Sequence, residues 1–167
     1  HFRNGANGYQ FADIKIDTFT FRCFNIHLQS NAVSGIANQV AEGGNLQQRE
    51  TWYNIRGMMG RYKRAAVARA REAEEISQLI DASPYPVILC GDFNDIPQSY
   101  VYQTLSYGLK DTFKAKGRGL GVTYAGKIPG LRIDYILSSP AFEILDFSVR
   151  EANFSDHYPV FSTIKQN

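Results

Sequence analysis

Residues 19–28, with the sequence FTFRCFNIHL, constrain the fold more than any other segment of this chain. Successive side chains of a strand point to opposite faces, and here both alternating sets contain aromatic or aliphatic residues. Such a strand is expected to be covered on both sides. Residues 9–16 alternate polar and apolar positions just before it, and Asp17 and Thr18 separate the two runs. This pattern predicts a β-hairpin.

One long helix is predicted over residues 61–82, where Ala, Glu and Arg dominate and the apolar residues share one helical face: Tyr62, Ala66, Ala73, Ile76 and Ile80. Apolar runs predict further strands at 87–90, 131–137, 144–150 and 159–164, and Pro97 is expected to open a short helix at 98–105. Segments rich in Gly or Asn predict irregular connections at 31–60 and 117–130. Strands separated by a helix and by turns indicate a layered α/β domain.

Composition agrees with one globular domain. The chain has 167 residues, of which 44% are hydrophobic and 13% aromatic, and this argues against a disordered, collagenous or disulfide-stapled protein. The formal charge of +2 is too small to indicate a polyanionic partner by itself. No run of about 18 apolar residues occurs, so no membrane span is expected. The first residues resemble neither a signal peptide nor a translation start, so we expect an internal fragment.

The two cysteines, Cys23 and Cys90, stand in apolar runs that are predicted to be strands. We expect both to be small buried residues, as unpaired cysteines usually are. A buried thiol is compatible with reducing and oxidising environments, so the compartment stays open.

Polar side chains recur where the predicted strands end, and loops at strand ends are where layered α/β folds build their sites. The residues are His27, Asp92, Asn94, Asp134, Asp156 and His157. Taken alone, an aspartate such as Asp92 more often caps a turn, and Asp156 with His157 could form a surface turn. Asp134 differs, because a carboxylate inside an apolar strand needs a partner. The recurrence is therefore the main functional signal.

Four short strings carry these residues: Asn25-Ile26-His27-Leu28, Gly91-Asp92-Phe93-Asn94, Arg132-Ile133-Asp134-Tyr135-Ile136-Leu137 and Ser155-Asp156-His157-Tyr158-Pro159-Val160. In this order they resemble the motifs of the endonuclease/exonuclease/phosphatase superfamily, the DNase I-like fold, and the sequence around Asp92 is most similar to bacterial members. One string would be weak evidence, whereas four in order are specific. The resemblance covers nearly the whole chain except residues 31–60.

The resemblance implies an α/β fold, the DNase I-like four-layer α/β/β/α sandwich. Residues 1–167 would form the carboxy-terminal part of one such domain, which lacks its amino-terminal strands. Family members open with a strand bearing an asparagine and a later strand bearing the glutamate that holds the catalytic Mg²⁺ or Mn²⁺. Neither motif precedes Tyr9. An apolar sheet face would then be uncovered, which predicts self-association through that face.

The resemblance also implies hydrolysis of phosphoester bonds by a metal- and base-activated water. Charged phosphate oxygens repel a nucleophile, so a cation and hydrogen-bond donors have to offset the charge of the transition state. By resemblance, Asp134 holds His157, which is either the general base or a cation that stabilises the phosphate. Asp92 orients or deprotonates the water. Asn94 positions the water and the phosphate, and His27 donates a hydrogen bond to a phosphate oxygen. Asp156 is a secondary metal ligand or supports one.

A basic segment spans residues 49–71, which contain seven Lys or Arg residues and one acidic residue. Its aromatic residues are Trp52, Tyr53 and Tyr62, and such a segment could line a groove for nucleic acid. The candidate substrate-binding residues are Arg61, Lys63 and Arg64. The alternative is a solvated helix face with aromatic residues packed on the domain.

Two classes of function stay open. The first is a divalent-metal-dependent nuclease or phosphodiesterase. Its leading substrate class is nucleic acid, and the alternatives are phospholipid head groups and sugar or inositol phosphates. The second is a catalytically incomplete fragment, or a non-catalytic binding or assembly module of the same fold. The first class requires turnover that is lost when the metal is chelated.

Overall fold

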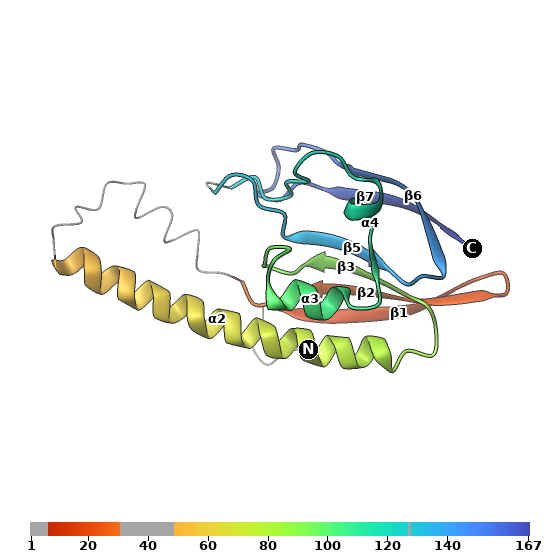
Figure 1. The fold of residues 1–167 in the computed structure, drawn as a ribbon, viewed down its shortest axis with the longest axis horizontal. Coiled ribbons are helices and arrows are strands. Elements are labelled where there is room, and N and C mark those ends of the chain that lie inside the picture. The colour runs from red at the N-terminus through yellow and green to blue at the C-terminus, as the bar shows by residue number, and fades with distance from the viewer. Residues whose placement is uncertain (1–6, 31–48, 127) are drawn as a thin grey trace.

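A five-stranded sheet, a two-stranded sheet and one long helix form the framework of the computed structural model, which describes residues 7–30, 49–126 and 128–167 (Figure 1). In chain order the elements are β1 (Gly8–Ile16), β2 (Phe19–His27), α2 (Arg49–Asp81), β3 (Val87–Asp92), α3 (Tyr100–Ser106), β4 (Lys110–Asp111), α4 (Thr112–Lys116), β5 (Asp134–Ser138), β6 (Phe142–Val149) and β7 (Val160–Gln166).

The larger sheet has the order β1-β2-β3-β5-β4, and β6 pairs with β7 in the smaller one. The predicted hairpin is confirmed, with Asp17 at a φ of 53° in its turn, a conformation that Asp tolerates better than most residues. β2 and β3 run parallel and are connected through α2, while β5 is antiparallel to β3. The α/β fold class predicted from the sequence is therefore confirmed.

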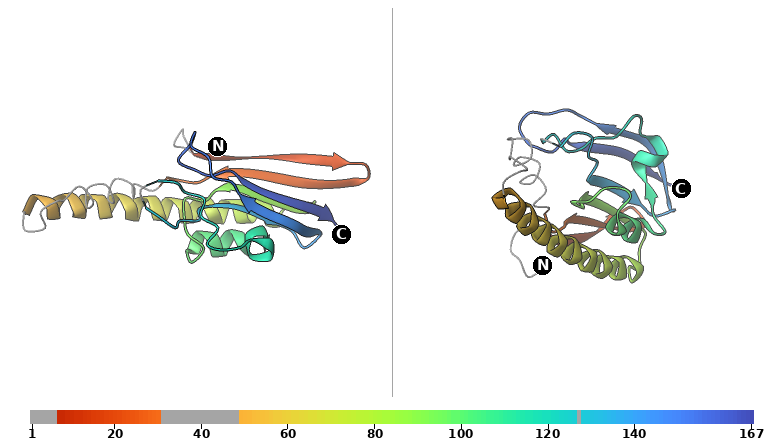
Figure 2. Two further views of the ribbon diagram at one scale, coloured as in Figure 1. Left: turned by 90° about the horizontal axis from the view of Figure 1, so that it is seen from above. Right: turned by 60° about the vertical axis from the view of Figure 1, so that its left-hand side comes forward.

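The apolar character of β2 on both faces has a structural reason. Phe24 and Ile26 are buried in one cluster with Ala73 and Ile76 of α2, and Figure 2 shows α2 and α3 on one side of the larger sheet. On the other face, the rings of Phe19 and Phe21 each lie 5.7 Å from the ring of Phe142 in β6. The smaller sheet thus covers part of the face that the helices leave open.

The long helix begins earlier than the sequence pattern predicts. It starts at Arg49, so the prediction of an irregular connection is wrong for residues 49–60, and residues 31–48 lie outside the described part of the chain. Figure 1 shows that the amino-terminal part of α2 extends beyond the sheet. A helical segment that covers no sheet needs no apolar stripe, so the period that marks residues 61–82 is absent there.

Short elements also differ from their predictions. Ser99, and not Pro97, caps α3, because its side chain accepts a hydrogen bond from the Tyr102 N–H. β4 and α4 fall outside every predicted element, since two and five residues are too few to show a period. Asp111 caps α4 and pairs with the buried Arg132 at 2.9 Å, which anchors this region beneath β5.

Cys23 and Cys90 are half-buried rather than fully buried, and they form no disulfide. The Cys90 thiol donates to the Phe24 carbonyl oxygen of β2 at 3.2 Å. Among the described residues, no helix combines the length and the apolar character that a membrane crossing requires.

The face of the β1–β2 hairpin opposite α2 is partly open. Ile14 and Ile16 are 38% and 59% exposed, and they share this face with their pairing partners Phe21 and Phe19. β1 is also an edge strand of its sheet, and such edges favour pairing with another chain. We propose that a second copy of the chain covers this face.

We expect the chain to form dimers or larger species at micromolar concentration in sedimentation velocity. The double substitution Ile14→Lys and Ile16→Lys should shift the distribution towards monomer, because charged side chains oppose burial of the face. Leu120→Lys, at an exposed position in a loop, serves as the control. A wild-type chain that sediments as a single monomer would contradict the proposal.

Candidate active site

The predicted site residues begin with a row across three neighbouring strands. His27 is the last residue of β2 and pairs with Asp92, the last residue of β3. Asp92 in turn pairs with Asp134, the first residue of β5. Pairing partners in adjacent strands carry their side chains on the same face. The three side chains therefore lie side by side where β2 and β3 end and β5 begins.

The turn after β3 holds Asp92 in place. Gly91 has a φ of 139°, and a Cβ there would lie 1.9 Å from the Ile26 carbonyl oxygen, so only glycine fits. Asn94 adopts a φ of 50°, which asparagine tolerates. Its backbone N–H donates to Asp92 Oδ1 at 2.7 Å, and its side-chain nitrogen donates to Asp92 Oδ2 and to the Leu28 carbonyl oxygen, both at 3.0 Å.

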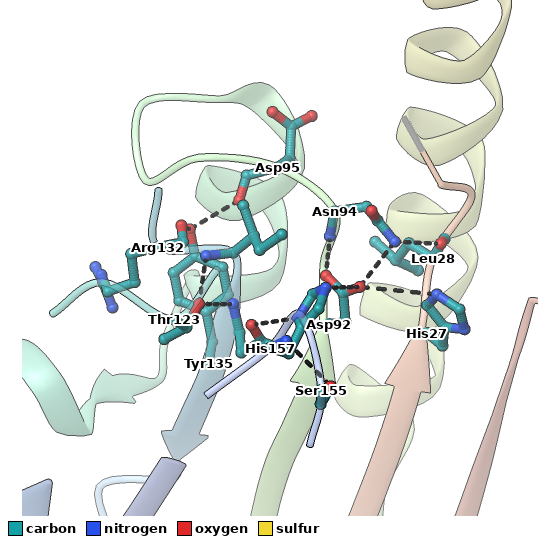
Figure 3. A network of polar contacts seen from close by, with 12 residues as sticks. His27, Leu28, Asp92, Asn94, Asp95, Thr123, Arg132, Tyr135, Ser155 and His157 are labelled. Carbon is teal, nitrogen blue, oxygen red and sulfur yellow. Dashed lines mark hydrogen bonds and ion pairs between the residues drawn. The ribbon is translucent and has the colours of Figure 1, made fainter. Parts of the chain in front are cut away.

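Both internal histidines converge on Asp92 (Figure 3). His27 Nε2 lies 3.7 Å from Asp92 Oδ2, and His157 Nε2 lies 4.0 Å from the same oxygen. The other ring nitrogen of His157, Nδ1, is hydrogen-bonded to Asp134 Oδ2 at 2.9 Å. The sequence predicted that the carboxylate of Asp134 needs a partner. The imidazole of His157 is this partner. The structure thus brings together His27, Asp92, Asn94, Asp134 and His157.

A cleft of about 530 Å³ opens over these groups. Its lining residues are His27, Ser30, Asp92, Asn94, Tyr124, Ile133, Asp134, Asp156 and His157. Asp156 is thus in the cleft as well. The sequence pattern missed Ser30 and Tyr124, since both lie in segments without a recognisable period. The Tyr124 ring packs edge-on against the His157 ring, with centroids 5.4 Å apart and planes at 74°.

The charges of the cleft shift the pKa values of two groups. Burial and the neighbouring charge of Asp134 raise the pKa of Asp92 to about 6. Burial lowers the pKa of the His157 imidazole, but the charge and the hydrogen bond of Asp134 more than offset it, so this pKa lies above its usual value. Two neighbouring titratable groups of the cleft thus both have a pKa above the usual value for their type, and such shifts are common at functional sites.

The donor set fits a divalent cation. Asp92, Asp134 and His157 each offer one ligand atom, and these atoms lie within 4.8 Å of one another. Carboxylate oxygens are the ligands that Mg²⁺ and Mn²⁺ prefer, and a cation would relieve the repulsion between Asp92 and Asp134. Asp156, the metal ligand predicted from the sequence, lines the same cleft but does not belong to this group of three.

The basic segment divides into exposed and buried residues. Arg61, Lys63 and Arg64 are exposed on α2 and do not line the cleft. Figure 1 shows the amino-terminal part of α2 running past the ends of β2 and β3, which carry His27 and Asp92. The side chains of Trp52 and Tyr53 lie outside the described residues.

Arg69 fits neither interpretation of the basic segment, a groove for nucleic acid or a solvated helix face. It is completely buried, with Nε 3.2 Å from Asp95 Oδ2 and Nη1 donating to the Gln29 carbonyl oxygen at 3.1 Å. Glu72, one helical turn further along α2, accepts from the Gln29 N–H at 2.8 Å. These bonds tie α2 to the loops that follow β2 and β3. The sequence offers no signal that separates Arg69 from its exposed neighbours.

Comparison with known proteins agrees with this geometry. The model of the Endonuclease/Exonuclease/phosphatase family matches residues 10–157. A search of curated proteins found no match. A family protein of Bacteroides vulgatus is 19% identical, with a TM-score of 0.66, over 95% of this chain and 55% of that one. A mannosyl-6-phosphatase of Bacteroides thetaiotaomicron is 21% identical, with a TM-score of 0.55, over 94% and 55%.

A third similar structure is TDP2 of D. rerio, complexed with a single-strand DNA product. It is 16% identical, with a TM-score of 0.61, over 96% of this chain and 62% of that one. At these identities the similarity concerns the fold. The chain spans less than two thirds of the length of each of these structures.

The raised pKa of Asp92 predicts how the free energy of unfolding depends on pH. A carboxyl group whose pKa rises from 3.8 to about 6 on folding stabilises the folded state below pH 4, and this contribution is lost as the pH rises through 6. Asp92→Asn removes the titration. Its free energy of unfolding relative to wild type should therefore increase from pH 4 to pH 7, by up to about 3 kcal/mol.

Urea unfolding at both pH values measures this difference. Asp81→Asn removes an exposed carboxylate at the end of α2 and is the matched control. If the difference for Asp92→Asn is the same at pH 4 and pH 7, burial and the charge of Asp134 do not raise the pKa of Asp92 in the folded protein.

Proposed function

The chain belongs to the endonuclease/exonuclease/phosphatase family, and from this membership we propose that it hydrolyses phosphoester bonds with a divalent cation. The supporting observation is that both internal histidines and two carboxylates converge in one cleft. The cleft holds the carboxylates of Asp92, Asp134 and Asp156, which would repel an anionic phosphoester. A bound cation would offset this repulsion.

We propose that Asp92 accepts the proton of the attacking water. With a pKa of about 6 it is ionised at neutral pH, yet it is a stronger base than an ordinary aspartate. Asp134 orients His157 through Nδ1, so that Nε2 faces Asp92 and the cleft. Because its pKa is raised, His157 carries a positive charge over a wider pH range and can stabilise a phosphate oxygen.

The other residues of the cleft have supporting roles in this proposal. His27, on the far side of Asp92, donates a hydrogen bond to a phosphate oxygen. Asn94 holds the carboxylate of Asp92 through its two hydrogen bonds. Mg²⁺ or Mn²⁺ would be held by carboxylates of the cleft other than the proton acceptor, with Asp134 and Asp156 as candidates, and would offset the charge that builds up on the phosphate.

We propose a phosphodiester as the substrate, with nucleic acid as the leading class. The support is the exposure of Arg61, Lys63 and Arg64 on α2. Hydrogen bonds from Arg69 and Glu72 tie this helix to Gln29, two residues after His27. Among similar structures, the complex of TDP2 contains a single-strand DNA product, whereas the mannosyl-6-phosphatase is named for a sugar phosphate. A small phosphomonoester is the second candidate.

Turnover of bis(p-nitrophenyl) phosphate with Mg²⁺ or Mn²⁺ tests the reaction. We expect hydrolysis that a chelator abolishes and a kcat/KM that rises as the pH passes through about 6, where Asp92 ionises. His157→Ala and Asp92→Asn should each lower kcat/KM by about 100-fold or more.

Glu143→Gln, which changes an exposed carboxylate of β6, is the control and should keep wild-type turnover. Turnover within tenfold of wild type for both site variants would contradict the proposed roles. Absence of hydrolysis by the wild type would favour a binding or assembly module of this fold.

The basic part of α2 is tested by salt dependence. If it contacts nucleic acid, the KM for a single-stranded oligonucleotide should rise steeply with salt concentration, since binding releases counterions. Replacing Arg61, Lys63 and Arg64 by Gln should reduce the slope of log KM against log salt by about 2. A triple Gln variant at the exposed positions Lys15, Lys116 and Lys165 is the control. Equal slopes in all three proteins would show that these residues form only a solvated helix face.

A further inference from the structure

Asp134 and His157 form their hydrogen bond across two different sheets. Asp134 begins β5 in the five-stranded sheet, and His157 precedes β7 in the two-stranded sheet. Strand pairing within either sheet does not set the distance between them. The 2.9 Å separation of His157 Nδ1 and Asp134 Oδ2 therefore depends on whatever joins the beginning of β5 to the turn at His157.

Residues 123–125 form this joint. On the side of β5, Thr123 Oγ1 accepts hydrogen bonds from the backbone N–H groups of Ile133 at 3.0 Å and Asp134 at 3.1 Å (Figure 3). The Thr123 N–H also donates to the Leu131 carbonyl oxygen at 2.9 Å. Thr123 thus adds three hydrogen bonds to the start of β5, beside the pairing of Asp134 with Asp92 of β3.

The other side of the joint holds His157. The Thr123 carbonyl oxygen accepts from the Tyr158 N–H at 2.7 Å, and the Ala125 N–H donates to the Asp156 carbonyl oxygen at 2.8 Å. Both chain neighbours of His157 are therefore bonded to this segment. Between these two bonds, the ring of Tyr124 packs against the imidazole and limits its rotation.

The surroundings of Thr123 make its hydroxyl the decisive contact. Its side chain is completely buried, and it lies in a loop that has Gly119 and Gly121 at positive φ just before it. Such a loop has little conformational preference of its own. A buried N–H that loses its acceptor costs about 1–3 kcal/mol, so without the hydroxyl the beginning of β5 would shift to find other partners.

We propose that Thr123 is a positioning residue that sets the alignment of Asp134 with His157 through its side-chain oxygen. The catalytic consequence rests on the proposed function, whereas the alignment itself does not. Thr123 contacts neither substrate nor the reacting atoms in this proposal. It acts through Asp134, and a misaligned carboxylate would leave the imidazole without its orienting bond.

The test compares Thr123→Val, which keeps the shape but removes the oxygen, with Thr123→Ser, which retains it. We expect Thr123→Val to lower kcat at least tenfold with KM within threefold of wild type, and Thr123→Ser to keep kcat within threefold. The second readout is the ¹⁵N chemical shift of His157 Nδ1 in histidine-labelled protein, assigned with His157→Gln. It should change in the Val variant and stay at the wild-type value in the Ser variant.

Thr112→Val is the matched control. Thr112 is also completely buried, and its hydroxyl donates to the Ile136 carbonyl oxygen of β5 at 2.9 Å. Its loss should lower the unfolding temperature without changing kcat or the Nδ1 shift. All variants are compared at a temperature where circular dichroism shows them folded.

The proposal is overturned if Thr123→Val keeps the wild-type Nδ1 shift, or if Thr112→Val changes the shift and kcat as much as Thr123→Val does. It is also overturned if Thr123→Ser behaves like Thr123→Val. If the wild type has no turnover, the proposed function fails, and the Nδ1 shift alone then decides the role of Thr123.

Discussion

The register of three neighbouring strands is the constraint on which the site depends. His27 pairs with Asp92 and Asp92 pairs with Asp134, so one row of strand partners carries an imidazole and two carboxylates on the same face. A shift of one residue in either pairing would turn a member of the row towards the helices. The core holds this register. Phe24, Leu89 and Leu137 pair with one another in the same three strands, and their side chains are buried on the opposite face.

Assembling the row has an electrostatic cost. Burial and the nearby charge of Asp134 together raise the pKa of Asp92, and shifted pKa values of this kind are common at functional sites. Local contacts offset part of the cost, since Asn94 donates twice to Asp92 and His157 pairs with Asp134. Away from the row, the buried Arg69 connects α2 to Asp95 and Gln29, so the long helix and the loops of the site form one bonded unit.

Periodicity predicted those elements that bury a face. The hairpin and the carboxy-terminal two thirds of α2 show it clearly, because Phe24, Ile26, Ala73 and Ile76 pack together. The amino-terminal part of α2 was missed, since it extends beyond the sheet and no apolar stripe facing the sheet is required there. Asp134 was predicted within a strand and instead begins one. The Leu131 carbonyl oxygen and the Ile133 N–H bond to Thr123, and the Ile133 carbonyl oxygen accepts from the Phe93 N–H beyond the end of β3.

The sequence by itself determined the residue types of the site and the strand ends on which they stand, because a carboxylate or histidine after an apolar run has few other places to lie. It also determined the turn at Asp92, where Gly91 is required by a close approach of two backbones. Only the tertiary structure decided that His27 and His157 meet at one oxygen of Asp92, that Arg69 is buried, and that Tyr124 lines the cleft. The reason is that these contacts join segments far apart in the chain, and their distances follow from strand register and from the joint at Thr123 rather than from any local pattern.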